Sequence, residues 1–173
     1  MSDPGTEPVT EDFARTPLWS GALLVAWILL LAGLGAMMGV LFPPGDWFAA
    51  LAKPTFQPPN WLFGPVWTVL YVAMAVSAWL IQRSVDADIA LRRRALVLFF
   101  VQFALNLAWT PLFFGLRNPG LAFIDICVLW ITLLWTLLTF GRVRPLAGYL
   151  MLPYLLWVSF ALVLNGTIWL MNL

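Results

Sequence analysis

Aromatic and amide side chains recur at helical spacing in three apolar segments. The three sets are Trp67 and Tyr71; Gln102, Asn106 and Trp109; and Trp157, Ala161, Leu164 and Asn165. Each set lies on one helical face, and we expect the faces to meet, because indoles and amides that face lipid lack hydrogen-bond partners. They would then form an aromatic cavity that stacks on a flat conjugated ligand, with Asn106 or an indole N–H orienting a carboxylate or carbonyl. Alternatively, Gln102, Asn106 and Asn165 only join helices together.

Other chemistry is restricted by what the chain lacks. It has no His and a single cysteine, Cys127, which excludes internal disulfides and His/Cys metal sites. No activated nucleophile or acid–base pair of an ordinary hydrolase or transferase is visible. Asp125 is the one carboxylate well inside an apolar segment, where its burial costs at least about 2.5 kcal/mol. We expect it to have a partner, and its role can be structural or functional.

The elements that position these residues are five apolar segments, at about 19–41, 65–83, 95–116, 119–141 and 145–171. Each is long enough to cross a hydrocarbon core as a helix. Hydrophobic residues make up 62% of the chain and charged residues 10%, against about 25% charged in soluble domains. A β-barrel would alternate in polarity, and these segments do not. We therefore predict an all-α integral membrane domain of five transmembrane helices over residues 18–173, after a disordered polar tail at 1–17.

Basic residues are distributed unevenly between the two sides of such a bundle. One side has Arg15, Arg83, Arg92, Arg93, Arg94, Arg142 and Arg144, whereas the other has Lys53 and Arg117. The positive-inside rule then predicts a cytoplasmic N-terminus and an outward C-terminus if the protein resides in an inner membrane, although it does not identify the membrane. The net charge of +1 argues against a nucleic-acid partner, and we interpret the run at 92–94 as a topology anchor.

Prolines mark the connections and two helix interiors. Pro111 and Pro153 fall inside apolar segments, where each is predicted to kink its helix. The first connection is long and has an amphipathic stretch from Asp46 to Lys53, followed by a stiff proline-rich part that carries Phe56 and Trp61. This connection can cap the mouth of the bundle, or its aromatic residues can anchor it at the membrane interface.

Four ordered motifs resemble one known family. They are Lys53-Pro54-x-x-x-Pro58-Pro59-x-Trp61; Gly64-Pro65-Val66-Trp67-Thr68-Val69-Leu70-Tyr71; the segment from Gln102 to Gly115; and Pro153-Tyr154-Leu155-Leu156-Trp157 with Leu164-Asn165. Together they resemble the TspO/MBR family of translocator proteins over about residues 40–166. Four motifs in the family's order are far more specific than any one of them.

The resemblance implies a five-helix bundle, often a homodimer, with a pocket that opens toward the long first connection. Such pockets bind porphyrins, some sterols and benzodiazepine-like drugs, so the expected ligand is protoporphyrin IX or a haem-like tetrapyrrole, with no obligatory cofactor. The family often has an acidic residue at the place of Asp125. The ligand-binding residues expected on this basis are Trp47, Phe56, Trp61, Trp67, Tyr71, Phe99, Gln102, Asn106, Trp109, Phe113, Trp157, Ala161, Leu164 and Asn165.

Two departures from the family pattern bear on the ligand. Phe56 stands where many members have Trp, which preserves stacking but removes an indole donor. In the last helix, the steroid-binding pattern of animal members continues with Tyr and Arg after the Leu-Asn pair, whereas here Gly166 to Trp169 follow with no later basic residue. This difference argues against cholesterol as a partner and favours a tetrapyrrole.

Small residues at four-residue spacing suggest helix association. They are Gly35-x-x-x-Gly39 and Ala104-x-x-x-Ala108. Such residues let two helices approach closely, and we expect a homodimer. The alternative is that these residues pack within one chain.

Three classes of function follow. The first is a receptor or regulatory protein that binds porphyrins and is linked to tetrapyrrole transport or stress regulation. The second is an enzyme that degrades porphyrins with light and oxygen, with Trp67 and Trp157 as redox-active neighbours of the ligand. The third is a transporter of small hydrophobic molecules, although a proton-coupled exporter would need a relay of more groups than Asp125 alone. A passive bundle without a ligand is the remaining alternative.

Overall fold

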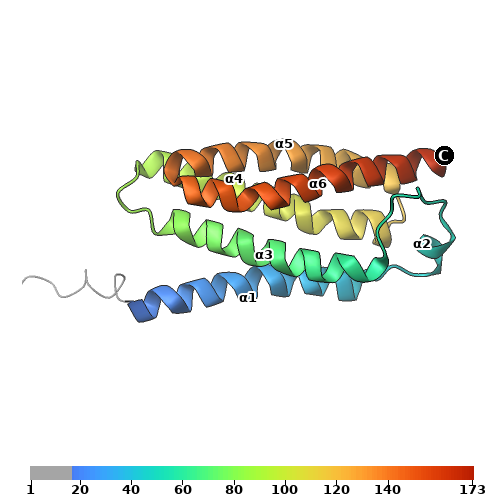
Figure 1. Ribbon diagram of the computed structural model, residues 1–173. Coiled ribbons are helices and arrows are strands. Elements are labelled where there is room, and N and C mark those ends of the chain that lie inside the picture. The colour runs from blue at the N-terminus through green and yellow to red at the C-terminus, as the bar shows by residue number, and fades with distance from the viewer. Residues whose placement is uncertain (1–16) are drawn as a thin grey trace, which may run out of the picture.

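The computed structural model describes residues 17–173 as a bundle of long helices (Figure 1). Its elements are α1 (Pro17–Leu41), α2 (Asp46–Ala50), α3 (Asn60–Gln82), α4 (Ile89–Thr110), the π-helical turn η3 (Pro111–Gly115), α5 (Pro119–Val143) and α6 (Pro145–Met171). Within the described residues, five helices are long and apolar enough to cross a membrane. The predicted all-α class with five membrane-spanning helices is confirmed. The tail predicted at 1–17 lies outside the described residues, except for Pro17, which begins α1.

The helix α3 begins at Asn60, five residues earlier than the expected start at 65. Pro65, the first residue of the expected apolar segment, lies inside α3. The first turn forms ahead of it, where the Leu62 N–H donates to the Pro59 carbonyl over 3.0 Å. Pro65 has no N–H to donate to the Trp61 carbonyl, but the turn at Pro59–Leu62 does not require that bond. Asn60 and Phe63 are therefore helical, which matters for the site below.

The helix α4 also begins earlier than expected, at Ile89 instead of 95. Asp88 is its N-cap, and the carboxylate accepts a hydrogen bond from the Leu91 N–H over 2.7 Å. The arginines at 92–94 therefore belong to the helix. At the other end, Pro111 begins the π-helical turn, in which the Leu116 N–H donates to the Pro111 carbonyl over 2.8 Å. The irregularity expected at Pro111 thus takes the form of a wide turn.

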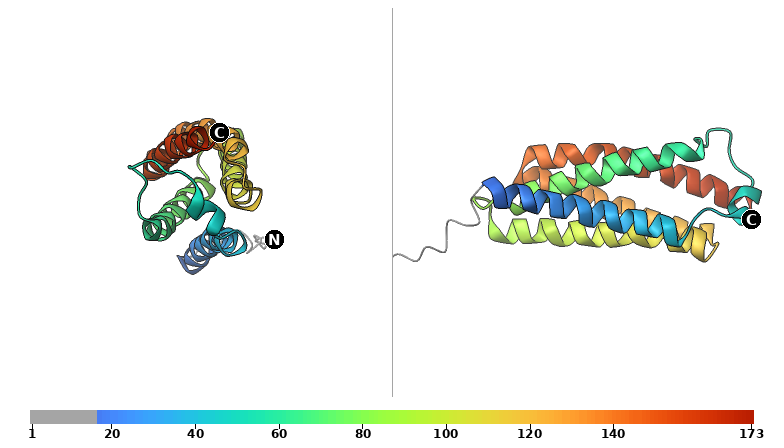
Figure 2. Two further views of the ribbon diagram at one scale, coloured as in Figure 1. Left: turned by 90° about the vertical axis from the view of Figure 1, so that its right-hand side faces the viewer. Right: turned by 90° about the horizontal axis from the view of Figure 1, so that it is seen from below.

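Because the described residues form an odd number of spans, the start of α1 and the end of α6 lie on opposite sides of the bundle. The helix α5 packs between α4 and α6, while α3 packs on α6 and on α1. Figure 2 shows that the start of α1 and the C-terminus lie at opposite ends of the bundle, and that α2 lies across the end that holds the C-terminus. Of the five spans, α1 is the least buried. The capping connection predicted from the sequence therefore exists as α2 and its flanking loops.

Glycine allows the closest helix contact of the core, between α5 and α6. A Cβ added to Gly148 would lie 2.8 Å from the Cα of Gly141 and 3.3 Å from the Leu137 carbonyl oxygen. These are backbone atoms, so relief requires the two helices to separate. A Cβ on Gly141 itself would meet nothing within 4 Å.

We therefore expect Gly148→Ala to destabilise the protein by about 1–3 kcal/mol, the usual cost of overpacking. Gly141→Ala is the matched control and should be neutral or slightly stabilising, because alanine is the better helix former. Thermal unfolding of the detergent-solubilised variants measures both. Equal melting temperatures for the two variants would contradict the close approach of α5 and α6.

Candidate ligand-binding site

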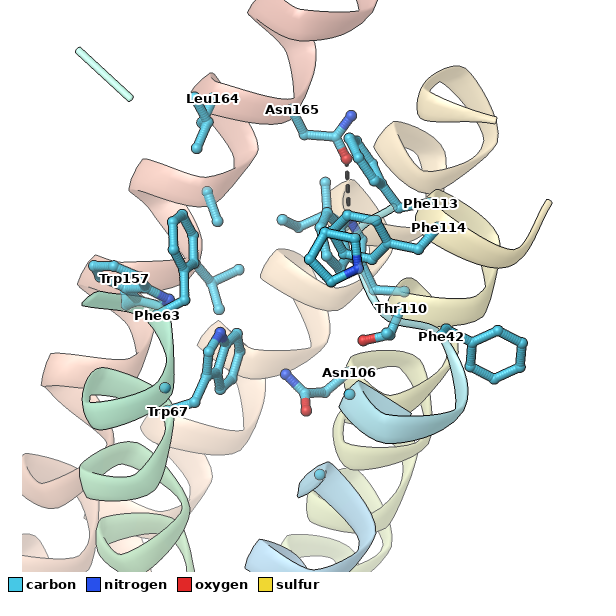
Figure 3. A pocket seen from close by; sticks show the side chains of 18 of the residues that line it. Phe42, Phe63, Trp67, Asn106, Thr110, Phe113, Phe114, Trp157, Leu164 and Asn165 are labelled. Atoms are coloured by element: carbon cyan, nitrogen blue, oxygen red, sulfur yellow. Dashed lines mark hydrogen bonds between the residues drawn. The ribbon is translucent and has the colours of Figure 1, made fainter. Parts of the chain in front are cut away.

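An apolar cavity of about 430 Å³ lies within the end of the bundle that α2 covers. Its wall comes from α1, α3, α4, η3, α5 and α6, and from the connection between α1 and α3. Figure 3 shows Trp67, Trp157 and Phe63 on one side of the cavity, and Asn106 and Thr110 on the other. The arrangement follows from sequence, since residues three and four apart on each helix present one face to the interior.

Nine of the expected ligand-binding residues line this cavity. They are Trp67, Tyr71, Asn106, Trp109, Phe113, Trp157, Ala161, Leu164 and Asn165. They come from three segments that are far apart in the sequence, α3, α4 with η3, and α6. The structure therefore brings together the three helical faces recognised from their spacing. Their binding of a ligand stays a prediction.

Two expected residues are too deep to reach the cavity. Gln102 and Phe99 are both completely buried in the interior, one and about two turns beyond Asn106 on α4. Phe99 stacks between other rings, with centroid distances of 6.3 Å to Phe103 and 5.9 Å to Phe140. Helical spacing shows that Gln102 shares a face with Asn106, but it does not show how far the cavity extends along α4.

Three expected residues lie outside the wall, in or beside the capping connection. Trp61 is 71% exposed and Phe56 is 47% exposed. For both residues, anchoring at the membrane interface remains an explanation of their exposure, because aromatic rings at the ends of membrane spans are common there. Trp47 packs edge-on against Phe113, with ring centroids 5.9 Å apart, so it supports the wall from behind.

The small residues of α1 are part of the site, which the sequence analysis missed. Ala32, Gly35, Ala36 and Gly39 line the cavity, so the motif considered for dimer formation is used within the chain. A Cβ on Gly35 would collide with the ring of Tyr71. The four-residue spacing was a usable signal, but periodicity does not say which neighbour a face contacts. The homodimer stays a prediction.

Other missed wall residues come from the start of α3 and from the connection before it. Asn60, Phe63, Gly64 and Thr68 follow the same i, i+3, i+4 face as Trp67. Asn60, Phe63 and Gly64 were not expected because α3 was predicted to begin at 65, whereas Thr68 lies within the predicted segment and its place on the face of Trp67 was overlooked. The connection contributes Phe42, Pro44, Phe48 and Gln57.

Asn165 joins three elements through hydrogen bonds. The Trp109 indole N–H donates to Asn165 Oδ1 over 2.9 Å (Figure 3), and Asn165 Nδ2 donates to the Pro119 carbonyl over 2.9 Å. These bonds connect α4, α5 and α6 at the end that contains the cavity. Asn165 therefore joins helices and also lines the cavity.

Asn106 is only partly satisfied. Its Oδ1 accepts a hydrogen bond from the Tyr71 hydroxyl over 3.0 Å. Within the described residues, no acceptor pairs with its Nδ2 or with the indole N–H groups of Trp67 and Trp157. The cavity thus holds three side chains with N–H donors available to a ligand. Its described wall carries no charged side chain, so recognition there depends on apolar area, stacking and these donors.

Asp125 lacks, within the described residues, the partner that was expected for its carboxylate. The residue is 9% exposed, and its Oδ2 has no hydrogen-bond partner within residues 17–173. The expected partner is therefore not found there, although the next residue, Ile126, lines the cavity. An isolated buried carboxylate is costly, so this group requires a separate explanation.

The capping connection is tied to the bundle by aromatic contacts and hydrogen bonds. Phe48 packs edge-on against Phe113 and Phe114, with centroid distances of 6.0 and 5.4 Å. Lys53 Nζ donates to the carbonyls of Ala49 and Leu51, both over 2.9 Å, and closes the end of α2. Beyond the end of α6, Asn172 Oδ1 accepts from the Ala52 N–H over 3.0 Å, and its Nδ2 donates to the Ala52 carbonyl over 3.0 Å.

Comparison with known proteins places this architecture in one group. The sequence model of the TspO/MBR family matches residues 22–170, which include every wall residue of the cavity. The chain belongs to the TspO/MBR family. The resemblance inferred from its motifs is thereby confirmed, and membership together with five spans makes it an integral multi-pass membrane protein.

Relatives within the TspO/MBR family cover most of the chain. A tryptophan-rich protein TspO from Chlorobaculum tepidum is 40% identical over 137 residues, which are 75% of this chain and 82% of the relative. The human translocator protein is 37% identical over 143 residues, 81% of this chain and 85% of the relative. Protein CrtK from Rhodobacter capsulatus is 36% identical over 135 residues, covering 78% and 83%. These relatives support a regulatory or transport role in a membrane.

Proposed function

We propose that this protein is a membrane receptor or regulator that binds porphyrins, such as protoporphyrin IX or a haem-like tetrapyrrole, in the aromatic cavity. The observation that carries the proposal is that the N–H donors of Trp67, Trp157 and Asn106 have no acceptor within the described residues and lie in a described wall without charged side chains. Indole faces stack on a flat conjugated ring, and N–H groups complement carboxylate or carbonyl oxygens. The role is linked to tetrapyrrole transport or stress regulation, in keeping with relatives named translocator protein and tryptophan-rich sensory protein.

The dimensions of the cavity are compatible with this proposal. Its volume of about 430 Å³ falls in the range of roughly 300–1,000 Å³ typical of small-molecule sites. Part of the wall is formed by Pro44, Phe48 and Gln57 of the capping connection, so movement of that connection enlarges the site and admits the ligand. Benzodiazepine-like drugs, which are aromatic and carry carbonyl groups, can also use the apolar wall and its N–H donors. We also propose that two copies of the protein form a homodimer. Chemical cross-linking in native membranes tests this, since a homodimer gives a cross-linked product of twice the mass of one chain.

The test is quenching of intrinsic Trp fluorescence by protoporphyrin IX in the detergent-purified protein. We expect saturable quenching, and we expect Trp67→Phe combined with Asn106→Leu to weaken apparent affinity about tenfold or more, through loss of two donors worth about 0.5–1.5 kcal/mol each. Trp135→Phe is the matched control, because Trp135 is 56% exposed on the outer face of α5. Non-saturating quenching that is equal in all three proteins would leave the proposal without support.

A further inference from the structure

Three deeply buried polar side chains lack hydrogen-bond partners within the described residues. Gln102 is completely buried, and neither Oε1 nor Nε2 of its amide has a partner. The Tyr154 hydroxyl is unpartnered in a residue that is also completely buried. The third is Asp125, through its Oδ2. These residues come from α4, α6 and α5, so three helices contribute orphaned atoms.

The orphaned groups adjoin the inner end of the cavity. On α5, Asp125 lies one turn before the wall residue Leu129, and on α6, Tyr154 lies one turn before the wall residue Val158. The Tyr154 ring also packs edge-on against Trp67, with centroids 6.0 Å apart. On α4, Gln102 is four residues before Asn106 and therefore lies on the same face, one turn deeper. Since Leu129, Val158 and Asn106 line the cavity, these groups continue its inner end. We call Gln102, Asn106, Asp125 and Tyr154 the polar floor.

The chemistry of the polar floor is mixed. The Gln102 amide offers both donors and an acceptor, the Tyr154 hydroxyl can do either, and Asp125 adds oxygens. Asn106 contributes its free Nδ2, because the Tyr71 hydroxyl already occupies its Oδ1. A cation would satisfy only the acceptors and an anion only the donors. A neutral group that both donates and accepts, such as water or a hydroxyl, can satisfy both.

We propose that the polar floor is a second subsite, which binds internal water in the ligand-free protein and a hydroxyl group at the inner end of a ligand in the complex. Buried polar groups in native proteins are nearly always paired with protein or ordered water. An internal water typically makes about two to four hydrogen bonds, and the polar floor offers four polar side chains for them. In hydrocarbon the cost of leaving buried polar groups unpaired is larger still. The ligand part rests on the proposed function, whereas the water part does not.

Transfer of magnetisation from water protons tests the water part directly. The chain has three glutamines, Gln57, Gln82 and Gln102, so solid-state NMR of protein with ¹⁵N-labelled glutamine in lipid bilayers gives few side-chain signals. We expect water to transfer magnetisation to the Gln102 amide as it does to Gln82, at the end of α3. Gln102→Met assigns the signal. Absence of transfer at Gln102, with transfer retained at Gln82, would overturn the proposal.

Stability provides a second readout that does not depend on any ligand. Gln102→Met and Tyr154→Phe remove the orphaned atoms while nearly preserving shape. If water pairs these atoms, the melting temperature should stay the same or fall. If the atoms are dry and unpaired, replacing them removes a penalty, and a raised melting temperature in both variants would contradict the water site.

A pair of neutral fluorescent probes tests the ligand part. We use 1-pyrenemethanol and 1-methylpyrene, which share a flat aromatic body and differ by one hydroxyl, and we measure energy transfer from Trp to pyrene. The protein should prefer the alcohol about tenfold, and Gln102→Met should abolish that preference while leaving the affinity for 1-methylpyrene unchanged. If the Gln102→Met variant prefers 1-pyrenemethanol over 1-methylpyrene as strongly as the unmodified protein does, the subsite is refuted. Since neither probe is a porphyrin, this outcome is distinguishable from failure of protoporphyrin IX to bind.

Discussion

Replacing Ala161 by phenylalanine is expected to weaken the binding of protoporphyrin IX about 100-fold. Ala161 lines the cavity on α6, where it lies between Trp157 and Leu164 on the same face. A phenyl ring there takes up part of the roughly 430 Å³ that a ligand needs. A 100-fold loss corresponds to about 2.7 kcal/mol, which is within the usual cost of overpacking a well-defined site.

The control for this prediction lies two residues further along the same helix. Val163 is 56% exposed on the outer face of α6, so Val163→Phe adds a larger ring without reaching the cavity. Its affinity should match that of the unmodified protein in the same quenching titration. Melting temperatures of both variants show that folding is preserved. If both variants bind porphyrin normally, the ligand does not occupy this cavity.

The sequence was sufficient to predict the architecture, because hydrophobicity over about 20 residues reports on the solvent of a helix. It was less informative about where helices begin. The start of α4 depends on Asp88 capping the Leu91 N–H, and that of α3 on a turn closed at Pro59. Both hydrogen bonds form before the expected apolar segments begin, so an estimate based on hydropathy places the two helix starts too late.

Part of the candidate site could be predicted from the helical spacing of its residues. Helical spacing correctly grouped Trp67 with Tyr71 and Asn106 with Trp109, because residues on one face share an environment. It could not tell how far along α4 the cavity extends, so Gln102 was placed with the wall although it lies below it. Nor could it show that Gly35 faces the ring of Tyr71, because contacts between helices depend on their packing order.

The sequence predicted a capping connection but not the hydrogen bonds that hold it to the bundle, and these bonds lead to the second large effect. Asn172 binds the backbone of Ala52 through two hydrogen bonds of 3.0 Å and donates a third to the Ile168 carbonyl over 2.7 Å. These contacts connect the end of α6 to the connection that carries Pro44, Phe48 and Gln57 over the cavity. A ligand that enters from the covered end must displace this connection.

We expect Asn172→Ala to increase the dissociation rate of protoporphyrin IX about tenfold. Losing two hydrogen bonds of about 0.5–1.5 kcal/mol each favours the open connection by about 1–3 kcal/mol, a range that includes the roughly 1.4 kcal/mol of a factor of ten. Thr167→Val is the matched control, since its hydroxyl bonds only to the Val163 carbonyl of its own helix, over 2.8 Å. Stopped-flow displacement of bound porphyrin measures the rate. Because the cover hinders entry and exit alike, the association rate should also rise, so that Asn172→Ala changes the rates more than the equilibrium affinity. A variant that loses affinity with an unchanged dissociation rate would assign Asn172 to ligand contact and not to the cover.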